Sequence, residues 1–324
     1  MVQIFLIGIA AGAASALLFA SVASGSLIAI LLFYLAPLPI LIAALGWSHL
    51  AGLVAALVAG GALAFVFGGL FLVAFLIGVG LPAWWLGYLA LLARPGAVPG
   101  ADALEWYPVG SLVVWAAVLG ASVVTAGVLT FGFDADAVRA GMRQAFEDML
   151  RLIWQVPQDK PLVIPDVPDA DRLLALLVLI VPPMAAGITT VTKIVTLGLA
   201  GVIARVSGRL ARPWPDLSAM RFPSFVPALL AGTVAATFLP NLISIIGGVF
   251  TVSLLIAYGV LGFAVLHKIT GRINGRSFLL AGTYAAVLML GWPILLMTIL
   301  GLADTAVDIR GRVAGRAPPP KSQT

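Results

Sequence analysis

The sequence contains no cysteine and only two histidines, and charged residues make up 10% of its 324 positions. The lack of cysteine excludes disulfides, thiolate metal sites and thiol nucleophiles. No H-E-x-x-H, G-x-S-x-G or P-loop pattern is present. We therefore expect no enzymatic activity, no cofactor and no metal site.

Residues 1–93 contain no charged side chain at all. Of the whole chain, 62% is hydrophobic and the mean hydropathy is +1.13, values that no soluble globular protein reaches. The apolar runs lack the alternation of a membrane barrel. The net charge of +5 comes without a basic, aromatic-rich patch, which argues against a nucleic-acid partner. The sequence predicts an all-α, polytopic membrane protein whose first partner is the lipid bilayer.

Apolar segments long enough for a hydrocarbon core of about 30 Å predict eight or nine transmembrane helices, several broken by Pro or Gly. We expect four parts: an N-terminal bundle of about five spans (1–133), an acidic polar segment (134–171), a C-terminal bundle of three to four spans (172–304), and a basic, disordered tail (305–324). In the first span, Gly8 and Gly12 have the spacing that lets helices approach closely. The last two predicted spans before the tail are 245–267 and 278–302. The segment before them either crosses as a span at 225–244 or only dips into the membrane at 222–244.

The acidic segment carries eight acidic against four basic residues. Within it, residues 135–155 have apolar side chains at helical spacing on one face and Arg143, Glu147 and Arg151 at i,i+4 on the other. This pattern predicts an amphipathic helix lying in the membrane interface.

Lys193 is the charge that lies deepest in an apolar segment, near the middle of a crossing from about Met184 to Ala204 that follows Pro182 and Pro183. An ammonium at that depth costs at least about 2.5–3.5 kcal/mol, so we expect it to face other helices or a wet cavity. Its helical neighbours are small or polar, whereas Ile188, Val191, Val195 and Leu199 on the opposite face are expected to meet lipid. The candidate ligand-binding residues are Lys193, Thr189, Thr190, Thr196 and Asn241; for Asn241 the alternative is a cap of the following helix.

Basic residues predict which loops are cytoplasmic. Segment 205–221 carries four arginines against one aspartate, so we expect it inside and the acidic segment 134–171 outside. Segment 268–276 and the tail are also basic, yet one predicted span separates them. Eight crossings would place the tail inside and nine would place it outside, and the sequence leaves both open.

The pattern IAYGVLGFAVLH at 256–267, a short basic loop, an apolar span and LGLADTAVDIRGR at 300–312 resembles the YybS-like family of polytopic bacterial membrane proteins. The resemblance implies a bacterial cytoplasmic (inner) membrane location but no activity. The N-terminal part also looks like the substrate-binding subunits of energy-coupling-factor transporters, which dock through small residues of their first helix, here Ala10 and Ala14. The cluster Asp304, Asp308, Arg310 and Arg312 has two interpretations, an ion-pair network at a helix end or a docking or gate site.

Two functions remain open. One is a small-molecule transporter or substrate-binding membrane subunit with Lys193 facing an internal cavity and a small anionic ligand. The alternative is a non-catalytic accessory or scaffold protein with a membrane or cytoplasmic protein partner.

Overall fold

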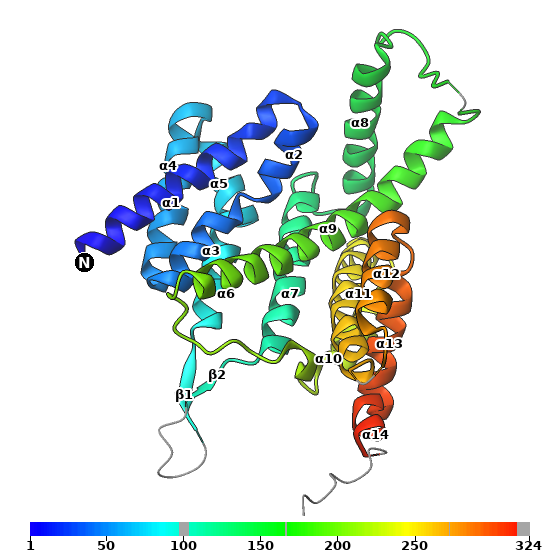
Figure 1. Cartoon of the computed structure of the whole chain (residues 1–324). Helices are drawn as coiled ribbons and strands as arrows, with labels where there is room; N and C mark the ends of the chain where they lie inside the picture. Colours follow the sequence, from blue (N-terminus) through cyan, green and yellow to red (C-terminus); the bar gives the residue numbers. More distant parts are fainter. Residues whose placement is uncertain (97–103, 166, 272, 316–324) are drawn as a thin grey trace, which may run out of the picture. The chain divides into compact units, whose positions relative to one another are not determined.

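Figure 1 shows the computed structural model, which describes residues 1–96, 104–165, 167–271 and 273–315. Asp166, Arg272 and the tail residues 316–324, on which some of our predictions fall, lie outside the described residues. Within them, seven helical segments are long and apolar enough to cross a membrane: Val2–Ser24, Leu27–Gly46, His49–Phe67, Gly69–Ala90, Val109–Leu129, Ala170–Val206 and Leu242–Ile269. The prediction of an all-α, polytopic membrane protein is confirmed.

The first ninety residues form a layer of closely packed helices: α1 (Val2–Ala20), α2 (Leu27–Tyr34), α3 (Pro37–Gly46), α4 (His49–Phe67), α5 (Gly69–Phe75) and α6 (Leu81–Ala90). Short η1 (Ser21–Ser24) follows α1, and η2 (Leu76–Gly80) joins α5 to α6. The predicted break at Pro37 is present, with Pro37 opening α3. Gly8 and Gly12 bring α1 against α4, since an added Cβ at Gly12 would lie 2.7 Å from the Ala55 carbonyl.

A two-stranded sheet of β1 (Ala93–Pro95) and β2 (Leu104–Trp106) follows, with antiparallel pairing of Arg94 and Glu105. The remaining helices are α7 (Val109–Leu129), α8 (Ala135–Trp154), α9 (Ala170–Val206), α10 (Val226–Thr237), α11 (Leu242–Ile269), α12 (Arg276–Leu290), α13 (Ile294–Val307) and α14 (Ile309–Gly315), with η3 (Leu217–Ala219) before α10. The expected disordered tail from 305 onward is helical up to Gly315, because Asp304 binds Arg310 across the α13–α14 turn.

The chain divides into two compact units. Unit 1 comprises 1–115, 194–227 and 255–324, and unit 2 comprises 116–193 and 228–254. This division cuts across the consecutive segments expected from the sequence, because the long helices α7, α9 and α11 each contribute to both units.

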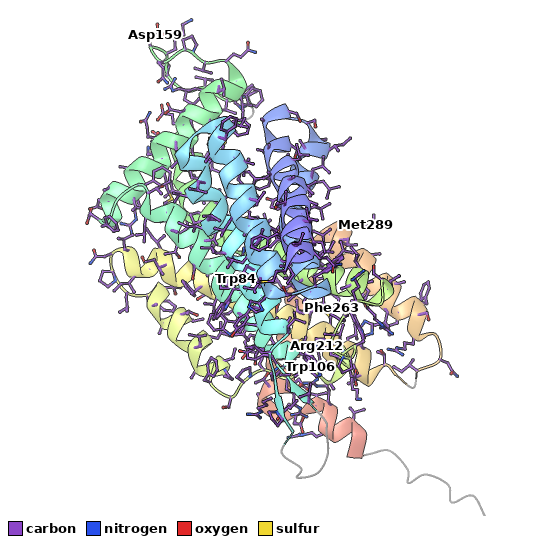
Figure 2. All side chains as sticks on the ribbon, turned by 90° about the vertical axis from the view of Figure 1, so that its left-hand side faces the viewer. Trp84, Trp106, Asp159, Arg212, Phe263 and Met289 are labelled. Atoms are coloured by element: carbon purple, nitrogen blue, oxygen red, sulfur yellow. The ribbon has the colours of Figure 1, made fainter. Side chains whose placement is uncertain are left out.

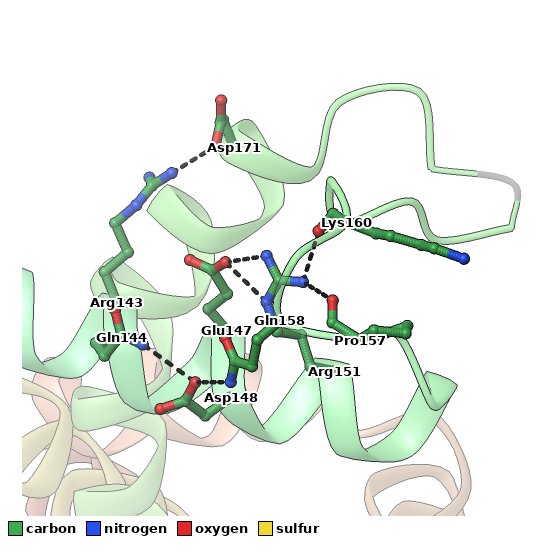
Figure 3. Close-up of polar contacts among 9 residues, drawn as sticks. All are labelled: Arg143, Gln144, Glu147, Asp148, Arg151, Pro157, Gln158, Lys160 and Asp171. Atoms are coloured by element: carbon green, nitrogen blue, oxygen red, sulfur yellow. Dashed lines mark hydrogen bonds and ion pairs between the residues drawn. The ribbon is translucent and has the colours of Figure 1, made fainter.

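In unit 2, α8 and the start of α9 are joined by a polar network (Figure 3). Arg143 pairs with Asp171, and Arg151 binds Glu147 at 2.6 Å while donating to the carbonyls of Pro157 and Lys160, both at 2.9 Å. The predicted amphipathic helix is present: Val138 and Met142 are buried against Val128, Val178 and Leu242. Its other end leaves Leu152 80% exposed.

The structure differs from the predicted spans in two places. The predicted span 225–244 is interrupted at Pro240 and Asn241, as expected, but the boundary with the next helix also lies there and not at 244–245, so α10 has only 12 residues, a length of about 18 Å. The predicted span 278–302 is divided at Gly291, Trp292 and Pro293 into α12 and α13, of 15 and 14 residues. Each half is about 21–23 Å long, short of the membrane core of about 30 Å.

Both ends of the α12–α13 pair lie near residues 216–221. Ser218 lines the same cavity as Arg276, at the start of α12, and its carbonyl accepts a hydrogen bond from Arg310, just beyond α13. If α12 and α13 formed one straight rod, these two ends would lie about 47 Å apart. The six residues 216–221 span only about 20 Å even when fully extended, so they could not contact both ends of such a rod. The chain therefore turns back at Gly291–Pro293, and the two helices form a hairpin (Figure 1).

The hairpin brings the basic segments of unit 1 to the same end of that unit. In unit 1, residues 205–221, 268–276 and 309–312 gather at one end, because Arg212 and Arg276 line one cavity and Arg310 binds the carbonyls of Ser218 and Met220. Hence residues 277–308, which connect segment 268–276 to segment 309–312, leave this end of unit 1 and return to it.

Candidate functional site

Unit 1 holds a cavity of about 880 Å³ with a largely apolar wall. The wall comes from the start of α7, the last turns of α9, the loop 210–220 and the second half of α11; Leu112, Gly198, Gly201, Val260 and Phe263 are examples. Six polar side chains interrupt this surface: Arg212, Asp216, Ser218, His267, Arg276 and Tyr284. The cavity is therefore apolar over most of its wall, and the polar side chains in that wall include two cations, Arg212 and Arg276.

Arg212 is half-buried and is one of the two cations in the cavity wall. One guanidinium NH donates to the Ala90 carbonyl at 3.1 Å, and the group lies 5.9 Å from the centre of the Trp106 ring (Figure 2). Its Nε is buried and has no acceptor among the described residues, where no carboxylate forms an ion pair with it either. Burial lowers the pKa of Arg212 from its usual value, but a guanidinium stays protonated. The cavity wall thus contains a partly dehydrated positive charge that pairs with no carboxylate among the described residues.

Arg276, His267 and Tyr284 also line the cavity, and they contact one another through His267. The Tyr284 hydroxyl lies 2.9 Å from His267 Nε2, and Arg276 lies 3.4 Å from His267 Nδ1. The Tyr284 ring stacks on Phe263 with centroids 4.8 Å apart. Both ring nitrogens of His267 are therefore occupied by α12 side chains.

Asp216 and Ser218 form a local turn at the start of η3. The Ser218 hydroxyl donates to Asp216 at 2.7 Å, and this bond, with a smaller contribution from the Lys268 charge, lowers the pKa of the Asp216 carboxyl. The single acid of the cavity wall is thus stabilised as an anion by its own loop, which leaves the two arginines as cations facing the cavity.

Asp304 and Arg310 anchor the loop 216–221 through hydrogen bonds to its backbone. Their side chains, 2% and 6% exposed, form an ion pair at 2.7 Å, and the Arg310 NH1 donates to the carbonyls of Ser218 (3.0 Å) and Met220 (2.8 Å). Asp308 pairs with Arg221 at 3.0 Å on the exposed side. The predicted Asp304, Asp308, Arg310 and Arg312 cluster is therefore divided: the first and third are buried together, the second pairs outward, and Arg312 is exposed.

The predicted face of α9 is buried as expected. Lys193 is 5% exposed, Thr190 and Thr196 are 0% and 2% exposed, and the opposite face, from Ile188 to Leu199, is open. Thr189 donates to the Ala185 carbonyl at 2.7 Å. Gly120 of α7 lies directly against Thr190, which shows the close packing that the small residues predicted.

Lys193 does not line the cavity of unit 1, although the next residue, Ile194, does. Asn241 is exposed before α11 with φ +69°, and its carbonyl accepts hydrogen bonds from Ser244. It therefore does not join the buried α9 face. Its predicted role in ligand binding stays a prediction, as does that of Lys193.

Unit 2 has a cavity of its own, of about 990 Å³, beside Pro182 and Pro183. Two arginines line it, but Arg139 pairs with Asp136 and Arg143 with Asp171. Since both charges are already neutralised, this cavity attracts an anion less than the cavity of unit 1.

Residues 13–305 match the family model described as "Predicted membrane protein (DUF2232)". The chain belongs to the DUF2232 family. No curated protein and no solved structure matches it. The expected family of membrane proteins is confirmed at that level, whereas the YybS-like assignment and the likeness to energy-coupling-factor subunits stay predictions. In this DUF2232 chain Ala10 and Ala14 are exposed, on a different face of α1 from the buried Gly8 and Gly12.

The polar residues of the cavity wall in this DUF2232 chain were not predicted from the sequence. Arg212, His267 and Arg276 were visible only as loop charges that orient the protein. The available signal was Trp214, an aromatic residue in a basic loop between two apolar helices, which Arg205 covers at 5.2 Å. That Arg212, His267 and Arg276 line one cavity depends on the three-dimensional path of the chain between α9 and α12.

Proposed function

We propose that this protein binds a small anionic amphiphile in the cavity of unit 1 and acts as a carrier or substrate-binding protein of the membrane. The observation that carries this proposal is Arg212, a half-buried guanidinium in the cavity wall that pairs with no carboxylate among the described residues. A partly dehydrated cation without a counter-ion is costly, and a phosphate or carboxylate in the cavity would pair with it.

The rest of the wall supports an apolar tail on the ligand. Apolar residues line most of the cavity, and its volume of about 880 Å³ falls in the usual range for small-molecule sites. An inorganic anion would leave this apolar surface uncovered, so a chain-bearing anion fits the cavity better.

We place the protein among carriers and binding subunits rather than enzymes because of how Ser218 and His267 are bonded. A serine nucleophile needs a base within hydrogen-bond reach. The Ser218 hydroxyl donates to Asp216 instead, and the nitrogens of His267 face Tyr284 and Arg276. This arrangement favours ligand binding over acyl or phosphoryl transfer.

Direct binding measurements test the proposal. The purified protein in a neutral maltoside detergent is titrated with oleoyl lysophosphatidic acid, with oleoyl lysophosphatidylcholine and with inorganic phosphate. We expect the acidic lipid to bind best, and Arg212→Gln to weaken it about 10–100-fold, the value of one charged hydrogen bond. Equal affinity for the two lipids in the wild type would refute the anionic preference.

Two variants serve as controls. Arg209 also lies over a tryptophan, 4.5 Å from the Trp47 ring centre, but does not line the cavity, so Arg209→Gln should bind as the wild type does. Lys193→Met tests the sequence-based candidate. A loss of binding in Lys193→Met with Arg212→Gln unaffected would move the anion site to α9.

We further propose that the basic end of unit 1 faces the cytoplasm of a bacterial inner membrane, with the acidic segment 134–171 outside, as the positive-inside rule favours. Because the chain lacks cysteine, single cysteines at Ile273 and Asp159 are clean probes. An impermeant maleimide added to intact cells should label the second and not the first; the opposite pattern would invert the orientation.

The accessory-protein alternative is favoured by a different feature, the exposed apolar end of α8. Leu152 and Ile153 are 80% and 61% exposed beside a loop that Arg151 holds in place. Purification in mild detergent tests it: a partner lost on Leu152→Ser would support this role, and recovery of the protein alone would count against it.

A further inference from the structure

Helix α12 differs from the other helices around the cavity in having no buried residue. Its apolar side chains are exposed, with Phe278 and Met289 at 86% and 83%. Gly275 precedes it with φ +86° and Gly291 follows it with φ +73°, conformations that glycine adopts without strain. The helix is therefore bounded by two permissive joints, and its movement exposes no packed core.

The polar and aromatic side-chain contacts between α12 and α11 in the described residues lie at the cavity. Tyr284 stacks on Phe263 and meets His267 at 2.9 Å, and Arg276 reaches His267 at 3.4 Å. All four of these residues line the cavity. A ligand in the cavity therefore lies against the groups that hold α12 in place.

Helix α13, the second arm of the hairpin, is held more firmly than α12. The Thr298 hydroxyl of α13 donates to the Leu255 carbonyl at 3.1 Å, and Gly301 lies against the backbone of Tyr258. Beyond α13, Arg310 makes the buried contacts with Asp304, Ser218 and Met220 described above. One arm is thus anchored at several points and the other by a single cluster.

We propose that α12 is a gate through which the amphiphile enters the cavity sideways from the lipid, with the Tyr284–His267 contact as its clasp and α13 as the fixed arm. This inference rests on the proposed function. An amphiphile partitions into the bilayer, so a lateral route spares its chain a passage through water. Opening the clasp would also free Arg276 to follow the anionic group.

A reversible tether across the gate tests this. In the cysteine-free chain, Phe263→Cys with Tyr284→Cys is bridged by a short bifunctional methanethiosulfonate reagent, and exchange of bound lysophosphatidic acid is followed by stopped flow. We expect bridging to slow exchange about tenfold or more, as a closed lid does, and a reductant to restore it. Each single-cysteine variant should exchange at the same rate with and without the reagent, because one cysteine cannot be bridged.

A second variant tests the clasp without a bridge. Tyr284→Phe keeps the ring stacked on Phe263 and removes one hydrogen bond, so we expect both association and dissociation to speed up about fivefold with little change in affinity. Unchanged exchange in the bridged protein, or in Tyr284→Phe, would overturn the gate while leaving the binding site standing. Failure of the wild type to bind the lipid at all would instead overturn the proposed function.

Discussion

Replacing Arg310 with methionine is the sharpest test of how the cavity loop is held. Arg310 donates from Nε and Nη2 to Asp304 Oδ2, at 2.9 and 2.7 Å, and from Nη1 to the Ser218 and Met220 carbonyls. Both side chains are almost fully buried, at 6% and 2% exposed. Removing the cation leaves the buried Asp304 carboxylate with only the backbone N–H of residue 310 as a donor and leaves two carbonyls without theirs, which costs about 3–5 kcal/mol in comparable cases.

The assay is thermal unfolding in detergent, followed by fluorescence size-exclusion chromatography. Arg221→Gln is the matched control, because the Arg221–Asp308 pair is 65% and 53% exposed and such pairs contribute about 0–1 kcal/mol. Combining Arg310→Met with Asp304→Leu should recover part of the loss, since no charge then remains buried alone. If Arg310→Met melts within the range of Arg221→Gln, the proposed role of this pair as the anchor of loop 216–221 is refuted.

Two packing predictions use the same unfolding assay, each with its control. An added Cβ at Gly12 would lie 2.7 Å from the Ala55 carbonyl, so Gly12→Ala should destabilise by about 1–3 kcal/mol, whereas Gly61 faces open space and Gly61→Ala should be neutral or stabilising. Met142 of α8 is 3% exposed and Met149 is 45% exposed, so Met142→Ala should cost about 2–5 kcal/mol and Met149→Ala much less. Equal melting of either matched pair would contradict the corresponding contact.

The membrane architecture was predictable because each long apolar run encodes one helix independently of the others. Gly8 and Gly12 on α1 and the two faces of α9 around Lys193 also followed from helical spacing alone. The hairpin of α12 and α13 did not follow. Residues 278–302 are apolar enough for one span, and only the ion pair of Asp304 with Arg310 and the latter's bonds to residues 218 and 220 show that the chain turns back.

The candidate site was less predictable because its residues come from distant segments. Sequence reasoning favoured Lys193, since an isolated charge in an apolar run is conspicuous. Arg212 and Arg276 lie in loops, where the positive-inside rule already accounts for a basic side chain. The same two arginines have a second property that the rule does not predict: both line one cavity.

Arg212→Lys separates these two properties. Lysine keeps the loop charge, so the orientation reported by the cysteine at Ile273 should not change. It lacks the planar guanidinium that lies over Trp106 and donates to Ala90 while carrying further N–H donors, so we expect weaker binding of lysophosphatidic acid. Wild-type affinity in Arg212→Lys would show that a point charge suffices, and the guanidinium geometry would then not explain the anionic preference.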